Sequence, residues 1–197
     1  MSVEAYQGQV KALFEENLGL ETLTEWRSQM DVGLYAPRVD VAIGPFAYEN
    51  GIHMTAEHND LFNNCQPFFI MLCHTHLENL ELIRNDTPED QKRDMVMEKL
   101  DIIYHTNYNA RCFMAIEVEN NVSRKHLMGG AINAAVLGRI GIAVGYTEEK
   151  HRAFLKLYRY FEFLRNVDKP TFNTSNLLII SKDQLTDAIV NFPNFNI

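Results

Sequence analysis

The chain has 197 residues, of which 46% are hydrophobic and 22% charged, and its formal net charge is -8. This composition predicts one packed globular domain rather than a disordered chain. Proteins that coat nucleic acid are usually basic, so the acidic balance argues against a large nucleic-acid footprint. An odd number of cysteines, no secretory signal and no run of about 18 apolar residues argue against a disulfide framework and a membrane span, and predict a cytoplasmic protein.

The N-terminal part begins with a helical pattern and continues into a strand. Residues 2 to 20 have the apolar spacing of an amphipathic helix, and a second short helix is expected over residues 21 to 30. Residues 39 to 43 alternate between apolar and small or polar side chains, which predicts a strand that ends at Gly44-Pro45. On that strand Asp40 points to the face opposite the valines.

The middle and the end of the chain alternate between helical and strand patterns. Residues 46 to 110 are mostly helical, and the helix that starts around Pro88 is expected to end near Tyr104. Residues 112 to 146 predict a strand, a polar turn, a helix rich in small residues and a second strand. A long helix, a short buried strand and a last helix opened by a Ser181–Gln184 capping box follow. The predicted fold class is α/β, with a central mixed β-sheet flanked by helices.

Two carboxylates stand where the strand that begins at Cys112 ends. Glu117 and Glu119 are two residues apart, so they share one face of the strand. Carboxylates on a buried strand repel one another and are costly to desolvate, and a shared proton, a cationic side chain or a metal ion would relieve this. Asp40 offers a third carboxylate, and three carboxylates with water suit Mg²⁺ or Mn²⁺. Without Asp40, two solvated surface glutamates are the simpler interpretation.

The segments PRVDVAIGP and AIEVENNVSRKHLMG together resemble the PD-(D/E)xK nuclease superfamily, which has the restriction-endonuclease-like fold. That pattern places an aspartate on one strand, a second acidic residue on the next strand, and a lysine two residues later. The resemblance assigns Asp40 to the aspartate and Glu117 to the second acid. Glu119 stands where the lysine is expected, which gives a Glu-x-Glu variant.

The resemblance extends to three further features of the chain. Lys125, in the first turn of the next helix, is a possible substitute for the lysine. An acidic residue of the first helix is often aimed at the site in this superfamily, and Glu16 is the preferred candidate as a metal ligand. The long gap between Asp40 and Glu117 implies a helical insertion over residues 47 to 108 within a single domain of residues 1 to 197.

The resemblance implies a metal-dependent nuclease that hydrolyses phosphodiesters. Asp40 and Glu117 would hold Mg²⁺ or Mn²⁺, and Glu119 or Lys125 would position or deprotonate a water. DNA is favoured over RNA as the substrate, and a homodimer is possible because many enzymes of this fold cut both strands as dimers. The alternative is a catalytically inactive module of the same fold, with a nucleic-acid-binding, protein-binding or regulatory role.

Two other patterns carry weaker signals. Cys65, Cys73, His74 and His76 lie within twelve residues, but they lack the paired spacing of a zinc site, and a buried helix is the better interpretation. The segment LKLYRYFEFLR, residues 155 to 165, combines aromatic and basic residues that would suit nucleic acid. At helical spacing, aromatics of this kind more often belong to the core.

Overall fold

A five-stranded mixed sheet forms the centre of the computed structural model, which describes residues 1–28, 37–49, 52–120, 123–169 and 173–192, apart from the Arg124 side chain. The strands follow the order β1-β2-β3-β4-β5, antiparallel from β1 to β3 and parallel from β3 to β5. Their bounds are β1 Thr22–Arg27, β2 Arg38–Ile43, β3 Cys112–Glu119, β4 Gly138–Gly145 and β5 Leu177–Ser181.

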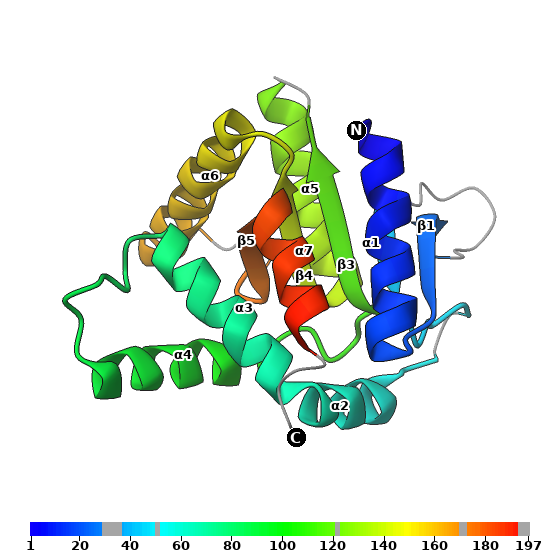
Figure 1. Cartoon of the computed structure of the whole chain (residues 1–197), viewed down its shortest axis with the longest axis horizontal. Helices are drawn as coiled ribbons and strands as arrows, with labels where there is room; N and C mark the ends of the chain where they lie inside the picture. The colour runs from blue at the N-terminus through cyan, green and yellow to red at the C-terminus, as the bar shows by residue number, and fades with distance from the viewer. Residues whose placement is uncertain (29–36, 50–51, 121–122, 170–172, 193–197) are drawn as a thin grey trace.

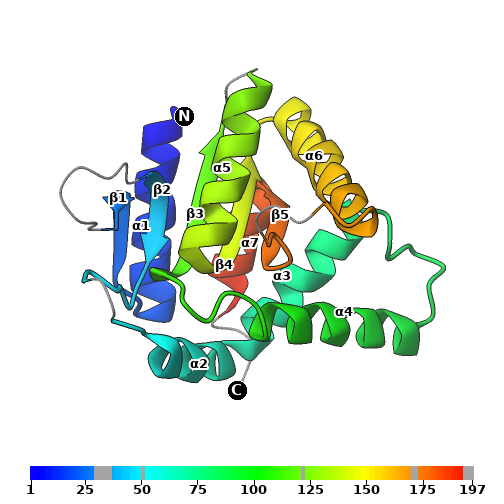
Figure 2. The ribbon, with the colours of Figure 1, turned by 180° about the vertical axis from the view of Figure 1, so that it is seen from behind.

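Helices cover both faces of the sheet (Figures 1 and 2). Helices α1, α3 and α7 pack on one face, and α5 and α6 pack on the other. The predicted α/β class with a flanked mixed sheet is therefore confirmed. The helices are α1 Val3–Leu18, α2 Thr55–Asn64, α3 Gln66–Asn79, α4 Glu89–Tyr104, α5 Arg124–Leu137, α6 Glu148–Asn166 and α7 Lys182–Asn191.

Burial on both faces explains the composition of the central strands. Every residue of β4 is buried, as expected for a parallel strand with helices on either side. Small residues let α5 lie directly on this strand, because a Cβ added at Gly141 would come within 2.8 Å of the Ala134 backbone. The close helix–strand packing holds the N-terminal half of α5 beside the end of β3.

Strands β2 and β3 pair directly although α2, α3 and α4 lie between them in the chain. Val41 pairs with Ile116 and Ile43 with Met114, in antiparallel register. The three intervening helices lie outside this pair, yet α3 packs against β5 and contributes to the core of its face. The sheet therefore brings the strand of Asp40 next to the strand of Glu117.

One predicted element is wrong. Residues 22 to 27 form β1 instead of part of a helix, and β1 pairs along its whole length with β2. Thr22, Thr24 and Trp26 are strand-forming residues, and pairing with β2 outweighs the helix-like spacing of Leu23 and Trp26. Residues 29 and 30 of the predicted helix lie outside the described residues.

The other predicted elements are confirmed within two or three residues, including the helix that ends at Tyr104. The Ser181–Gln184 capping box is present, with both of its hydrogen bonds. Among the helices of the described residues, none is long and apolar enough to span a bilayer.

Candidate functional site

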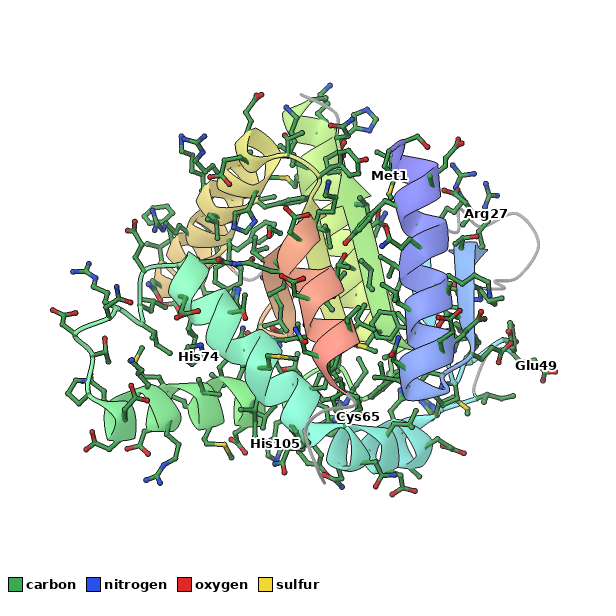
Figure 3. All side chains as sticks on the ribbon, in the orientation of Figure 1. Met1, Arg27, Glu49, Cys65, His74 and His105 are labelled. Carbon is green, nitrogen blue, oxygen red and sulfur yellow. The ribbon has the colours of Figure 1, made fainter. Side chains whose placement is uncertain are left out.

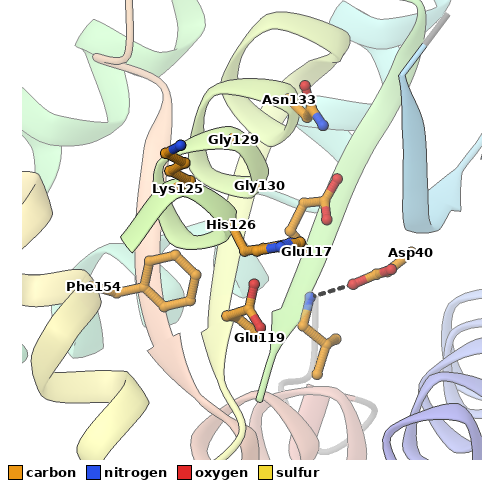
Figure 4. A pocket seen from close by; sticks show the side chains of 10 residues that line it. Asp40, Glu117, Glu119, Lys125, His126, Gly129, Gly130, Asn133 and Phe154 are labelled. Atoms are coloured by element: carbon orange, nitrogen blue, oxygen red, sulfur yellow. Dashed lines mark hydrogen bonds between the residues drawn. The ribbon is translucent and has the colours of Figure 1, made fainter. Parts of the chain in front are cut away.

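A pocket of about 420 Å³ opens where the C-terminal end of β3 meets the first half of α5 (Figure 4). Strands β2 and β3 contribute its acidic residues, and α5 contributes its small and basic ones. We call this pocket the candidate site. It is lined by Asp40, Glu117, Val118, Glu119, Lys125, His126, Gly129, Gly130, Asn133 and Phe154.

Asp40 lies at the point where β2 and β3 part. Extending the register by one residue beyond the Val41–Ile116 pair puts Asp40 opposite Glu117. The main-chain N–H of Val118 donates a 2.7 Å hydrogen bond to Oδ2 of Asp40, as Figure 4 shows. A second hydrogen bond comes from the buried side chain of Gln7, on α1. These bonds fix the Asp40 carboxylate at the rim of the candidate site.

Glu117 faces α5 and is largely enclosed. The strand alternation sends Ile116 and Val118 into the core of the opposite face, as predicted. The Glu117 carboxylate accepts a hydrogen bond from Asn133, and a Cβ added at Gly130 would lie 3.5 Å from its Oε2. Its other oxygen, Oε1, is buried and has no hydrogen-bond partner among the residues that the structure describes. A buried carboxylate oxygen without a donor is costly and requires an explanation.

Burial and neighbouring negative charge raise the pKa of two carboxylates of the candidate site, Asp40 and Glu117. Burial raises the pKa of Glu117 well above its usual value, and the negative charge of Asp40 raises it further. Burial also raises the pKa of Asp40 to about 6, against the opposing effect of the Val118 N–H. Both groups therefore hold their charge only at a cost that a nearby cation would offset.

Glu119 and Lys125 reach the candidate site from different directions. Glu119 ends β3 on the same face as Glu117, and its charge raises the pKa of both Asp40 and Glu117. Lys125 lies in the first turn of α5, is exposed, and makes no ion pair with Asp40 or Glu117 in the described part of the chain. Figure 4 shows Glu119 directed into the pocket and Lys125 on its α5 side.

A fourth acidic residue, Glu25 on β1, was missed by the sequence analysis. Thr24 pairs with Val41 and Trp26 with Val39, so Glu25 falls opposite Asp40. Its charge raises the pKa of Asp40 and Glu117, and its carboxylate forms an ion pair with Arg38. Its φ of 55° is a strained, left-handed conformation for a residue with a side chain. Glu25, Asp40 and Glu117 stand on three neighbouring strands, and we call them the acidic row, although Glu25 itself lines a separate pocket with Gln7 on the α1 side.

The structure does not bring Glu16 to the candidate site, so its predicted place beside the other acids is wrong. Glu16 is exposed near the end of α1, nine residues or about 13 Å along the helix from Gln7. Gln7 is the residue of this helix that contacts Asp40. An amide carries no charge, and so a search for acidic residues on the first helix passed over it.

The candidate site suits Mg²⁺ or Mn²⁺ better than a metal held only by protein ligands. Within the described ranges, no three His, Cys, Asp or Glu residues lie close enough together to hold an ion by themselves. Mg²⁺ is usually bound by one or two carboxylates together with waters and substrate phosphate. The unpartnered Oε1 of Glu117 and the carboxylate of Asp40 are donors of that kind. The residues present therefore fit an ion that is shared with a substrate.

The cysteines and histidines of α3 belong to a different part of the molecule. All three cysteines are buried and none forms a disulfide. His76 is fully buried, and its Nδ1 accepts a 3.0 Å hydrogen bond from the N–H of Ile179. Figure 3 shows Cys65 and His74 on the α2 and α3 side. Helix α3 packs on the face of the sheet opposite to α5, which lines the candidate site.

Comparisons with protein-family models, with curated proteins and with solved structures find no match to this chain.

Proposed function

We propose that the chain is a metal-dependent nuclease that hydrolyses phosphodiester bonds, in DNA rather than RNA, and that its fold is restriction-endonuclease-like. The observation that carries this proposal is the candidate site itself. Two carboxylates with raised pKa values line it, and one buried carboxylate oxygen has no hydrogen-bond partner among the described residues. A divalent cation would relieve both conditions.

The order of the elements supports the resemblance noted in the sequence. The aspartate and the glutamate stand on neighbouring strands, as the superfamily pattern requires. A helix and a parallel strand follow the glutamate, and the first helix contacts the aspartate through Gln7. The acids also lie at the carboxyl end of the parallel strands β3 and β4, where open α/β sheets usually bind their ligands.

Each residue of the candidate site has a distinct role in this proposal. Asp40 and Glu117 would hold the cation, which would supply positive charge to the scissile phosphate and make the attacking water more acidic. Val118 N–H and Gln7 orient Asp40, and Asn133 orients Glu117. Glu119 accepts the proton of the attacking water, because it shares the face and the pocket of Glu117. Lys125 is the second candidate for that step.

Removing the charge of either cation ligand tests the proposal. Asp40→Asn and Glu117→Gln each keep the side-chain shape, and each should lower Mg²⁺- or Mn²⁺-dependent cleavage of DNA by about a thousandfold or more. Glu16→Gln is the matched control, since Glu16 is an exposed carboxylate outside the pocket. Cleavage that persists in both Asp40→Asn and Glu117→Gln would exclude the assignment.

The same assay decides whether Glu119 or Lys125 accepts the proton of the attacking water. Glu119→Gln should lower the cleavage rate more than Lys125→Met, because Lys125 is exposed on the α5 side of the pocket. A larger loss in Lys125→Met would transfer the role to the lysine.

A catalytically inactive module of the same fold is the second candidate function. It is favoured by the position of Glu119, where the superfamily pattern has a lysine. Such a protein would bind nucleic acid or a protein partner without cleaving a phosphodiester. Wild-type protein that binds DNA but leaves it intact in Mg²⁺ and in Mn²⁺ would support this function over hydrolysis.

A further inference from the structure

The outward face of α6 carries a row of exposed side chains that the candidate site does not use. Arg152, Lys156, Tyr160 and Phe163 follow one another three or four residues apart, so they lie in line along one face of the helix. We call this row the α6 stripe. Lys156, Tyr160 and Phe163 belong to the aromatic and basic segment of residues 155 to 165, and their exposure shows that only part of that segment is core.

A groove of about 780 Å³ runs beside the α6 stripe, between α5 and α6. Leu127, Met128 and Leu157 contribute apolar surface to it, and Arg152, Lys156 and Tyr160 of the stripe also line it. Figure 2 shows the two helices side by side on the same face of the sheet. The α5–α6 groove therefore combines an apolar lining with two cationic side chains and one acidic side chain, Glu149.

The aromatic end of the α6 stripe is unusually open to solvent. Tyr160 is 46% exposed and Phe163 is 56% exposed. Their rings stack on one another, with centroids 6.4 Å apart and an angle of 22° between the planes. Flat aromatic faces in solvent are the surfaces on which unpaired bases stack.

The charged residues that line the α5–α6 groove are Glu149, Arg152 and Lys156, so its lining is net positive although the whole chain carries -8. Arg152 pairs with Glu148 at 3.2 Å, and Glu149 pairs with Lys150 at 3.1 Å. Lys156 has no ion pair among the residues that the structure describes. An unpaired cation beside stacked aromatics is complementary to a phosphate backbone with unpaired bases.

The α5–α6 groove adjoins the candidate site through consecutive residues. Met128 lines the groove and Gly129 lines the candidate site, while Ala153 lines the groove and Phe154 lines the candidate site. A strand bound along the α6 stripe would therefore need to pass only the first turns of α5 to reach the carboxylates.

We propose that the α6 stripe and the α5–α6 groove bind single-stranded nucleic acid and guide it to the candidate site. The guiding role rests on the proposed nuclease function, whereas the binding does not. Bases stack on Tyr160 and Phe163, and Lys156 and Arg152 contact phosphates. A short binding surface of this kind is compatible with an acidic protein.

Binding is measured by fluorescence anisotropy with labelled oligo(dT) and oligo(U) of equal length, in EDTA so that no cleavage occurs. Compared with the wild-type protein, Tyr160→Ala/Phe163→Ala should bind both oligonucleotides at least about tenfold more weakly. Lys156→Glu should also bind them more weakly, and its binding should depend less on salt. The matched controls are Tyr48→Ala and Lys92→Glu, which alter an exposed tyrosine and a lysine on other elements. Unlabelled duplex of the same length should compete poorly, because its bases are already stacked.

Three outcomes would overturn the proposal. The first is wild-type binding that the α6 variants leave unchanged, and the second is equal competition by duplex. The third is a wild-type protein that does not bind either oligonucleotide and self-associates in sedimentation, with the Tyr160→Ala/Phe163→Ala variant monomeric. That result would make the groove an interface between two copies of the chain.

The two proposals fail separately. If the wild-type protein binds single strands through the α6 stripe but does not cleave them with Mg²⁺ or Mn²⁺, the nuclease function fails and the binding surface stands. If cleavage depends on Asp40 and Glu117 but not on the α6 stripe, the function stands and the binding surface fails.

Discussion

The two ends of the parallel strands carry buried charges of opposite sign. At the end where β4 and β5 begin, Arg139 and Lys99 are buried cations with no acidic partner within the described ranges. At the other end, where β3 finishes, Glu117 is a largely buried acid beside further acids. The difference lies in how each charge is satisfied.

The cations are satisfied by carbonyl groups and aromatic rings. Arg139 donates to the carbonyls of Thr106, at 2.6 Å, and Tyr104, and it lies 4.4 Å from the centre of the Tyr108 ring. Lys99 donates to Ser175 O at 2.8 Å and to the Tyr158 hydroxyl at 3.0 Å. Arg139 stands on β4 and its partners belong to α4 and the segment after it, whereas Lys99 stands on α4 and its partners belong to α6 and the segment before β5. Both cations therefore fasten the α4 region to the body of the protein.

The acids have no comparable set of donors. Glu117 has Asn133 on one side and an unpartnered oxygen on the other, and Asp40 and Glu119 add negative charge. The Nε atom of Arg139 also has no partner among the described residues, but both terminal nitrogens donate hydrogen bonds, to Thr106 O and to Asn59 Oδ1. The cationic end therefore has a structural role, and the acidic end fits the ligand-binding role that we propose.

The largest effect expected from this comparison is at the cationic end. Arg139→Met should lower the free energy of unfolding by about 3 kcal/mol, because buried carbonyls lose charge-assisted donors. Urea denaturation measures the change, and the exposed Arg93→Met is the control, expected to stay within about 0.5 kcal/mol of wild type. A similarly small change in Arg139→Met would remove the structural assignment.

The second prediction concerns the acidic end and a divalent ion. An ion at a hundred times its Kd stabilises a folded protein by about 2.7 kcal/mol. Asp40 has its pKa raised to about 6, so the metal-free protein loses stability as the pH rises from about 4, the usual aspartate value, through 6. Ion binding requires the charged Asp40 carboxylate, so the stabilisation by the ion increases as the pH rises.

Thermal unfolding with and without Mg²⁺ checks this pH dependence. The increase in Tm caused by the ion should be small at pH 5 and large at pH 7.5. In Asp40→Asn the increase should be absent at both pH values. A stabilisation by Mg²⁺ that is equal at pH 5 and pH 7.5, or that persists in Asp40→Asn, would place the ion elsewhere.

A third, smaller effect has the opposite sign to that of Arg139. Glu117→Gln should stabilise the metal-free protein at pH 7.5, because it removes the unfavourable burial of a charge, and that burial raises the pKa of Glu117. The gain should vanish below about pH 4, where the wild-type carboxyl is protonated in both states. Glu16→Gln should show no gain at either pH. A loss of stability in Glu117→Gln at pH 7.5 would indicate a structural glutamate.

The sequence alone predicts the elements and part of the acidic end. Alternation along residues 39 to 43 and 112 to 119 places Asp40 on one strand and Glu117 with Glu119 on one face of another. Strand period and helix caps are local signals, so they survive in the sequence. That β2 and β3 are neighbours follows from a long-range pairing, which the resemblance suggested and periodicity does not contain.

The parts that the sequence did not predict depend on neighbours far away in the chain. Glu25 joins the acidic row because β1 pairs with β2, and the segment was expected to be helical. Gln7 and Asn133 are neutral side chains whose importance comes only from the carboxylates that they contact. A search for charged residues selects Glu16 instead, which has the charge but not the position.

The smallest expected effect tests whether Glu25 belongs to the acidic row. Glu25→Gln removes a charge that raises the pKa of Asp40, so that pKa should fall below about 6. Carboxyl ¹³C chemical shifts followed through a pH titration measure the change, with Glu16→Gln as a control in which Asp40 titrates as in wild type.

Arg38 loses its ion pair with Glu25 in the Glu25→Gln variant. Its charge is then no longer offset, and this also lowers the pKa of the neighbouring Asp40. Arg38→Gln removes that contribution, so Glu25→Gln/Arg38→Gln should retain a smaller decrease. No decrease in either variant would mean that Glu25 lies beside the candidate site without acting on it, and its strained backbone would then have to be explained by the β1–β2 pairing alone.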